Sequence, residues 1–303
     1  MGRVLVADPI ADSAVAKIKA AGLEVVTRNY DTDGPIEEQI KGFDCVVVRS
    51  ATTITKEVIE ASDKLKLVVR AGVGLDNVDI DAAKAKGIVV QNTPEAPTVS
   101  VAEMVFSLMF ALARQVTQAD SSMKDERWEK KKLKGTELWN KTLGIVGFGR
   151  IGQEVGKRAK AFDMEVLAYD VIDIDDACKQ VGAKRADLAT IIENADYISL
   201  HVPLLPQTKG MFGEKEFKTM KKTAFLVNTA RGGVVDEKAL LDALNEGDIA
   251  GAALDVFEKE PPVDWQVVKH PKLIATPHLA SSTGEAQVRV GDLTAQKVID
   301  GLK

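Results

Sequence analysis

The sequence predicts an α/β protein made of two doubly wound parallel sheets of the Rossmann type. Short apolar runs rich in β-branched residues alternate with helical stretches along nearly the whole chain, a pattern typical of a parallel sheet with helices on both faces. In the middle of the chain, one such run leads directly into a glycine-rich turn, a helix and a second apolar run. We expect the first domain to be discontinuous and the active site to lie in the cleft between the two domains.

Length and composition set the broad class of protein. With 303 residues, of which 45% are hydrophobic, the chain can form two domains with substantial cores. Its net charge of −5 argues against a general nucleic-acid binder. No apolar run is long enough to span a bilayer, the N-terminus opens directly into a predicted strand, and Cys45 and Cys178 form no disulfide pattern. We therefore expect a cytoplasmic protein that binds neither nucleic acid nor membrane.

The N-terminal part of the chain predicts one α/β unit that ends at a proline-rich boundary. Pro94 and Pro97 mark this boundary, because proline can continue neither a strand nor a helix. The elements before it are strands at residues 3–7, 23–27, 45–48, 67–70 and 88–91 and helices at residues 11–21, 36–41, 56–61 and 79–86.

A long, strongly apolar helix is predicted at residues 99–119. Its apolar face is wide enough to pack between domains or against a second subunit, although a helix buried inside one domain fits the pattern equally well. A charged run that carries Trp128 follows at residues 122–134, and such a run is usually a solvated face.

The most specific motif lies in the middle of the chain, where Gly147, Gly149 and Gly152 have the spacing GxGxxG. The first glycine allows a tight turn, the second lets the backbone approach a pyrophosphate, and the third lets the helix pack close to the sheet. Asp170 lies roughly 20 residues further on, where a carboxylate can accept hydrogen bonds from ribose hydroxyls. No Arg or Lys follows directly, which favours NAD over NADP. The flanking elements are a strand at residues 142–146, a helix at 153–162 and a strand at 164–169.

The remaining elements complete a nucleotide-binding domain of about six strands. The last helix, at residues 284–302, follows this domain, so we place it back on the first one. The predicted domains are therefore residues 1–95 with 279–303, which would bind substrate, and residues 96–278, which would bind NAD. The other predicted elements are strands at residues 197–202, 224–228, 251–256 and 273–275 and helices at 187–194, 215–220 and 236–245.

Three histidines are candidates for the base that accepts the hydroxyl proton when an alcohol carbon loses hydride. His278 is predicted on a segment that crosses between the domains, whereas His201 ends a strand and His270 lies in a proline-rich loop. Glu260 follows a strand end and could hold the imidazole of His278, while Arg231 could bind a substrate carboxylate. These residues alone leave other interpretations open: a surface arginine, a loop acid and a capping histidine.

Five motifs, in this order, resemble signatures of the D-2-hydroxyacid dehydrogenase family: GFGRIG, HVPLLPQTKG, NTARGGVVDEKAL, GAALDVFEKEPP and TPHLASSTGEAQ. The resemblance implies that Arg231 binds substrate and that Glu260 assists His278 as the acid/base. A Glu at this position, where related formate dehydrogenases have Gln, disfavours formate. The resemblance also implies NAD as cofactor and no metal, with cofactor contacts at Gly147, Gly149, Arg150, Ile151, Gly152, Asp170, Val202, Thr229, Ala230, Asp255 and Ser281.

Within the family, RSATTIT, RAGVGLDNVD and the charged run most closely resemble members that oxidise 3-phosphoglycerate in serine synthesis. The resemblance implies a homodimer, which we place at the helix near residues 99–119. Lys130 would reach the phosphate of the partner subunit's substrate, although a solvated face explains this lysine equally well. Longer members carry a C-terminal serine-sensing domain beyond the position of Lys303, so we expect no serine feedback through such a domain. The implied substrate contacts are Arg49, Arg70, Val73, Gly74 and Lys130.

Two other functions fit the same sequence. A glyoxylate or hydroxypyruvate reductase would keep the chemistry and act on an unphosphorylated acid. An NADH-sensing corepressor would keep the fold, but such proteins usually carry extended disordered tails, which this sequence lacks.

Overall fold

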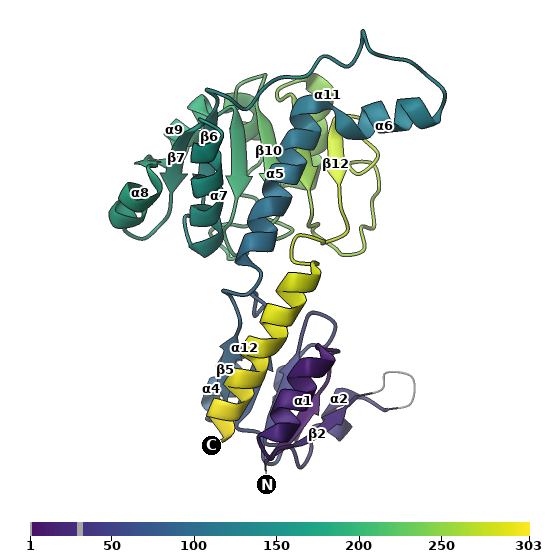
Figure 1. The fold of residues 1–303 in the computed structure, drawn as a ribbon, viewed down its shortest axis with the longest axis vertical. Helices are drawn as coiled ribbons and strands as arrows, with labels where there is room; N and C mark the ends of the chain where they lie inside the picture. Colours follow the sequence, from purple (N-terminus) through teal and green to yellow (C-terminus); the bar gives the residue numbers. More distant parts are fainter. Residues whose placement is uncertain (1, 29–32) are drawn as a thin grey trace. The chain divides into compact units, whose positions relative to one another are not determined.

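The computed structural model describes residues 2–28 and 33–303 and confirms the predicted α/β fold. The chain divides into two compact units, the first formed by Met1–Pro97 with Ser281–Lys303 and the second by Thr98–Ala280 (Figure 1). These divisions lie close to the ones that the sequence suggests at residues 95/96 and 278/279. Each unit contains one sheet whose strands all pair in parallel.

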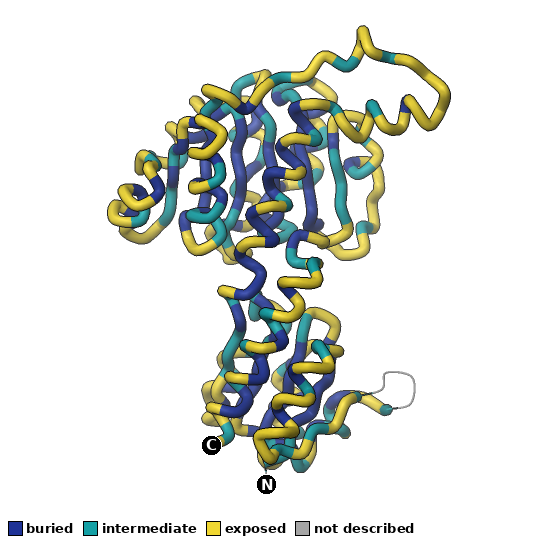
Figure 2. The backbone as a smooth tube through the Cα atoms, viewed as in Figure 1, coloured by how far each residue is buried: buried dark blue, intermediate teal, exposed yellow. Residues whose placement is uncertain are grey.

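The first unit is built on a five-stranded sheet with strand order β2-β1-β3-β4-β5. Its central strand, β3, has the sequence CVVV and is buried along its whole length. Figure 2 shows buried segments inside this unit and exposed segments along its surface. Such an unbroken apolar run is expected for a strand that is covered on both faces. The strands are β1 (Arg3–Val6), β2 (Glu24–Thr27), β3 (Cys45–Val48), β4 (Leu67–Arg70) and β5 (Val89–Asn92).

Alternate side chains of this sheet feed two separate cores, as the pleat requires. Val4 and Val6 of β1 pack with residues of α1 and α12, whereas Leu5 belongs to the core on the opposite face. The C-terminal helix therefore completes the core of the N-terminal strands, and Figure 1 shows it lying beside α1. The helices are α1 (Asp12–Ala20), α2 (Ile36–Gln39), α3 (Lys56–Ala61), α4 (Ile80–Ala85) and α12 (Gly284–Leu302).

The second unit has a seven-stranded sheet with strand order β12-β11-β10-β9-β6-β7-β8. The sequence predicts about six strands, and the additional one is β8, an exposed two-residue strand at the sheet edge. A segment this short has no hydrophobic alternation from which it could be predicted. The strands are β6 (Thr142–Val146), β7 (Glu165–Tyr169), β8 (Lys184–Arg185), β9 (Tyr197–Leu200), β10 (Phe225–Asn228), β11 (Gly251–Leu254) and β12 (Leu273–Ala275).

Helices cover both faces of this second sheet. Residues of α5, α7 and α8 pack into one core, and residues of α9, α10 and α11 pack into the other. The helices are α5 (Thr98–Arg114), α6 (Val116–Lys124), α7 (Arg150–Ala161), α8 (Asp175–Val181), α9 (Leu188–Asn194), α10 (Glu214–Thr219) and α11 (Glu237–Glu246).

The single helix predicted at residues 99–119 is wrong, because α5 and α6 are separate helices. Gln115 lies between them in the left-handed region, with φ of 50°, and the two axes differ by 64°. The side-chain amide of Gln115 donates to the carbonyl oxygen of Lys134 at 2.9 Å, which ties the break to the far end of the charged run. Among the described helices, none alone has the length and apolar composition needed to cross a membrane, and only the bent pair α5–α6 passes that test.

The close packing of β6 against α9 can be tested by adding a methyl group at Gly144. A Cβ atom at Gly144 would lie 2.4 Å from Cγ2 of Ile191 and 3.1 Å from Cβ of Ala195. We expect Gly144→Ala to lower the free energy of unfolding by about 1–3 kcal/mol, because the added methyl group overpacks this contact. Gly284→Ala is the control, since in the part of the chain that the structure describes a Cβ atom there meets no atom within 4 Å. Equal denaturation midpoints for the two variants would contradict this packing.

Candidate active site

The three glycines of the turn between β6 and α7 are not equivalent in their surroundings. A Cβ atom on Gly147 would lie 2.6 Å from the carbonyl oxygen of His201, and one on Gly152 would lie 2.3 Å from that of Gly147. Gly147 also has a φ of 92°, which L side chains rarely adopt. A Cβ atom on Gly149, in contrast, meets no atom of the described residues within 4 Å. The protein's own packing therefore requires the first and third glycines, while the second leaves open space for a ligand.

The N-terminus of α7 adds hydrogen-bond donors to this turn. Gly149 is its N-cap and has no side chain to cap the free N–H groups of the first turn, in which Arg150 and Ile151 lie. Free N–H groups and the helix dipole together favour a bound phosphate. Val202 also lies here, since its Cγ1 atom would be 3.1 Å from a Cβ atom on Gly147. These features fit the pyrophosphate of a dinucleotide.

Asp170 lies at the end of β7 and is tied to the glycine turn. Its Oδ2 atom accepts a hydrogen bond from the Phe148 N–H at 2.8 Å, and its Oδ1 atom accepts one from the Val171 N–H at 2.7 Å. These bonds hold the carboxylate beside the turn that would carry the phosphates, as a ribose contact requires.

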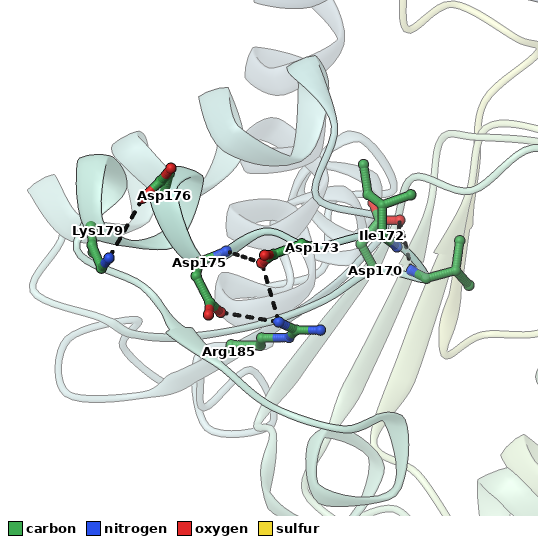
Figure 3. Close-up of polar contacts among 8 residues, drawn as sticks. Asp170, Ile172, Asp173, Asp175, Asp176, Lys179 and Arg185 are labelled. Atoms are coloured by element: carbon green, nitrogen blue, oxygen red, sulfur yellow. Dashed lines mark hydrogen bonds and ion pairs between the residues drawn. The ribbon is translucent and has the colours of Figure 1, made fainter.

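A cationic residue, Arg185, lies on the strand next to β7, and the sequence analysis did not predict it. Arg185 on β8 is in register with Ala168 of β7, and its Nη1 atom contacts Asp173 at 3.2 Å and Asp175 at 3.1 Å (Figure 3). Hydrogen bonding to Asp175 is the main cause that raises the pKa of Arg185. Its guanidinium is therefore neutralised locally by two acids.

His278 and Glu260 are brought together as predicted. Nδ1 of His278 lies 2.7 Å from Oε2 of Glu260, and both side chains are partly exposed. Oε1 of Glu260 accepts a hydrogen bond from the Phe257 N–H at 3.2 Å, which orients the carboxylate. Glu260 thus favours a proton on Nδ1, and the opposite ring nitrogen, Nε2, is left to exchange a proton with a ligand.

A buried carboxylate holds the turn that carries His278. Asp255 follows β11 and is 0% exposed. Its side chain accepts hydrogen bonds from the Thr276 hydroxyl at 2.5 Å and from the Leu279 and Ala280 N–H groups at 2.7 and 2.8 Å. Its carbonyl oxygen accepts a bond from the N–H of His278, which has a left-handed φ of 54°. These bonds fix the backbone from which the imidazole projects, a role that the sequence did not indicate.

The neighbouring strand end positions Arg231. Asn228 ends β10, its amide donates to the Arg231 carbonyl at 2.9 Å, and its Oδ1 atom accepts from the Ala230 N–H at 3.0 Å. The hydroxyl oxygen of Thr229 is buried and has no hydrogen-bond partner among residues 2–28 and 33–303. A buried polar atom without a partner is costly, so this oxygen suits contact with a ligand. The carboxyl ends of β10 and β11 are adjacent, since the Asp255 N–H donates to the Asn228 carbonyl at 2.9 Å.

The substrate contacts implied by the sequence lie mostly in the first unit, as does Ser281. Arg49 follows β3 and lines a cavity of about 250 Å³ beside the start of α1. Arg70 ends β4, and its guanidinium lies so close to Gly72 that a Cβ atom there would be 1.5 Å from Nη1. The Val73–Gly74 turn follows, and the Val73 carbonyl accepts a hydrogen bond from Asn92 at 2.5 Å.

Lys130 is exposed on the charged run of the second unit. Its neighbours Glu129 and Lys132 form an ion pair with each other at 2.9 Å.

The other two histidines do not share the environment of His278. Nε2 of His201 lies 2.8 Å from the Ser199 hydroxyl, and desolvation lowers the pKa of His201 to about 3. His270 accepts a hydrogen bond from the Lys272 N–H at 3.1 Å, and desolvation lowers its pKa as well. Neither ring is paired with a carboxylate in the described ranges.

The pKa of His201 gives a pH prediction. The unfolded chain binds a proton at this site below a pH of about 6.5, whereas the folded protein binds it only near pH 3. The contribution of His201 to the free energy of unfolding should therefore fall as pH drops from 6.5 to 3, by up to about 1.4 kcal/mol per pH unit. NMR titration should show no midpoint for the His201 ring between pH 5 and 8, with its signals assigned from their loss in His201→Gln. A midpoint near 6.5 would contradict the desolvation of this ring.

Comparison with known proteins agrees with this geometry. Residues 106–280 match the profile of the D-isomer specific 2-hydroxyacid dehydrogenase, NAD binding domain. D-3-phosphoglycerate dehydrogenase of Methanocaldococcus jannaschii is 46% identical over 299 residues, which cover 98% of this chain and 57% of that protein. The chain thus spans little more than half the length of this relative.

Solved structures share the fold over almost the whole chain. The TT0316 protein from Thermus thermophilus has a TM-score of 0.90 and 32% identity, covering 99% of this chain and 96% of that one. D-Lactate dehydrogenase from Aquifex aeolicus, solved with NAD and lactic acid, has a TM-score of 0.86 and 30% identity, covering 98% and 94%. The chain therefore belongs to the D-isomer specific 2-hydroxyacid dehydrogenase family and contains its NAD-binding domain.

Proposed function

We propose that the protein oxidises 3-phospho-D-glycerate at C2 to 3-phosphohydroxypyruvate, the first step of serine synthesis, with NAD as cofactor. The contact between His278 and Glu260 carries this proposal, because it places a carboxylate-supported imidazole at the edge of the nucleotide-binding sheet. The similarity to a D-3-phosphoglycerate dehydrogenase at 46% identity supports the substrate.

When bound, NAD supplies the acceptor for the C2 hydride. The uncapped N–H groups of the first turn of α7 would hold its pyrophosphate, and Asp170 would accept hydrogen bonds from its ribose. The residues expected to complete the pocket are Val202, Thr229, Ala230, Asp255 and Ser281.

The ion pairs of Arg185 support NAD over NADP. A 2′-phosphate needs an available cation, and this guanidinium is engaged by Asp173 and Asp175. Asp170 would in addition repel a phosphate at the ribose.

His278 takes the proton from the C2 hydroxyl at Nε2 as the hydride leaves. Glu260 stabilises the resulting imidazolium through Nδ1. Arg231 binds the substrate carboxylate, to which the backbone N–H groups near Val73 and Gly74 also contribute. Arg49 and Arg70 are the cations that we propose for the phosphate, with Lys130 as a contact to the partner subunit's substrate.

We also propose a cytoplasmic homodimer that forms through α5 and the segment after it. Several large apolar side chains on these elements are exposed, which supports an interface there. They are Val99, Phe110, Val116, Met123 and Trp128, the last with 78% of its surface exposed.

The substrate proposal is tested by NADH formation with 3-phosphoglycerate, D-glycerate and glycolate at equal concentration. We expect a clear preference for the phosphorylated acid, and NADP in place of NAD should support little turnover. Equal or faster turnover of the unphosphorylated acids would instead indicate a glyoxylate or hydroxypyruvate reductase.

The role of His278 is tested by His278→Ala. We expect turnover to fall by about 10²–10⁴-fold, the range typical of losing a general acid–base catalyst. NADH binding, followed by fluorescence, should be largely retained, because among residues 2–28 and 33–303 the hydrogen bonds of the glycine turn do not involve this ring. His270→Ala is the matched control and should keep turnover near that of wild type. Near-normal turnover of His278→Ala would exclude this residue as the base.

A further inference from the structure

Two polar side chains clamp the turn that carries Arg49 in the first unit. The turn spans residues 49–52 and directly follows β3. Its tip, Ser50 and Ala51, is exposed, whereas Thr52 is only 4% exposed. The turn is therefore anchored at both ends and open to solvent in the middle.

Asp8 forms one half of the clamp. It follows β1, is 1% exposed, and its Oδ2 atom accepts hydrogen bonds from the N–H groups of Arg49 at 2.5 Å and Thr52 at 3.1 Å. Its Oδ1 atom accepts a bond from the Thr52 hydroxyl at 2.6 Å. A buried carboxylate is stable only when donors surround it, so these bonds satisfy its charge and fix the turn together.

Asn77 forms the other half of the clamp. Its side-chain amide donates to the carbonyl oxygens of Arg49 and Thr52, both at 2.6 Å. The main-chain carbonyl of Asn77 accepts a hydrogen bond from the Ile54 N–H at 2.8 Å, which extends the connection beyond the turn. The main chain of Arg49 is thus held at its N–H by Asp8 and at its carbonyl by Asn77.

The clamp also joins two candidate substrate contacts. Asn77 lies shortly after the Val73–Gly74 turn, which we propose for the substrate carboxylate, and it holds the Arg49 turn, which we propose for the phosphate. A site that recognises both ends of one small molecule needs these two turns at a fixed spacing, because misplacement weakens charge-assisted bonds.

We propose that Asp8 and Asn77 are positioning residues that set the selectivity for a phosphorylated 2-hydroxy acid. Asp8 holds the Arg49 turn to the end of β1, and Asn77 ties it to the segment that follows the Val73–Gly74 turn. This inference rests on the proposed function and extends it from the residues that bind the phosphate to those that place them.

The test compares kcat/KM for 3-phosphoglycerate and D-glycerate in wild type, Asn77→Ala and Thr52→Val. Asn77→Ala removes the two side-chain hydrogen bonds to the Arg49 and Thr52 carbonyls. Thr52→Val removes one hydrogen bond to Asp8 with little change of side-chain shape. The Thr52→Val variant keeps the test informative if Asn77→Ala does not fold. We expect Asn77→Ala to lower the ratio of the two kcat/KM values roughly tenfold, mainly through KM for the phosphorylated acid, and Thr52→Val to lower it less.

Asp44→Asn is the matched control. Asp44 also holds a main-chain N–H of this unit, that of Arg3 at 3.0 Å, but it lies at the opposite, amino end of β3. Its substitution should leave the ratio unchanged. Amide hydrogen exchange at residues 49–52 should accelerate in Asn77→Ala and not in Asp44→Asn.

The outcomes separate this inference from the proposed function. A wild-type enzyme with no preference for the phosphorylated acid would overturn both. If the wild-type preference survives unchanged in Asn77→Ala and Thr52→Val, or if kcat/KM falls equally for both substrates, only the inferred role of Asp8 and Asn77 in selectivity would be overturned.

Discussion

The candidate site depends on the buried carboxylate of Asp255. Its side chain is surrounded by a hydroxyl and two N–H groups from a turn more than 20 residues away. Burying this charge without such donors would be costly, so the turn must close on it for the domain to fold. The same closure holds His278 in its left-handed conformation and faces the ring toward Glu260. Folding and placement of the imidazole thus rest on one set of hydrogen bonds.

Both units use the same device at the carboxyl ends of their strands. Asp8 follows β1 and Asp255 follows β11, and each accepts N–H groups from a turn that follows another strand. Turns at this edge lie beyond the ladder of the sheet, and ligands of open α/β folds bind there. Beyond the last strand-to-strand hydrogen bond, the carboxylate at the strand end holds the turn by its own hydrogen bonds. Residues on the turn are therefore held in place almost as firmly as residues of the sheet.

Local patterns in the sequence were sufficient for the glycine turn and for most strands and helices, because alternation and glycine spacing are read over short windows. The pair Glu260–His278 needed the family resemblance, since 18 residues separate its members. The break at Gln115 could not be predicted, because a non-glycine residue adopts the left-handed region there. The partners of Arg185 and Asp255 are set by strand order and by turns distant in the chain, which no local window contains.

The ion pairs of Arg185 bear on how the cofactor preference could be changed from NAD to NADP. In dinucleotide-binding folds, an Arg near the end of the second strand accommodates the 2′-phosphate of NADP. Here a guanidinium already stands on the neighbouring strand, in register with Ala168 and held by Asp173 and Asp175. Removing Asp173 or Asp175 would free a positive charge that the chain already carries on the strand beside β7, so a design for NADP can begin by deleting these acids.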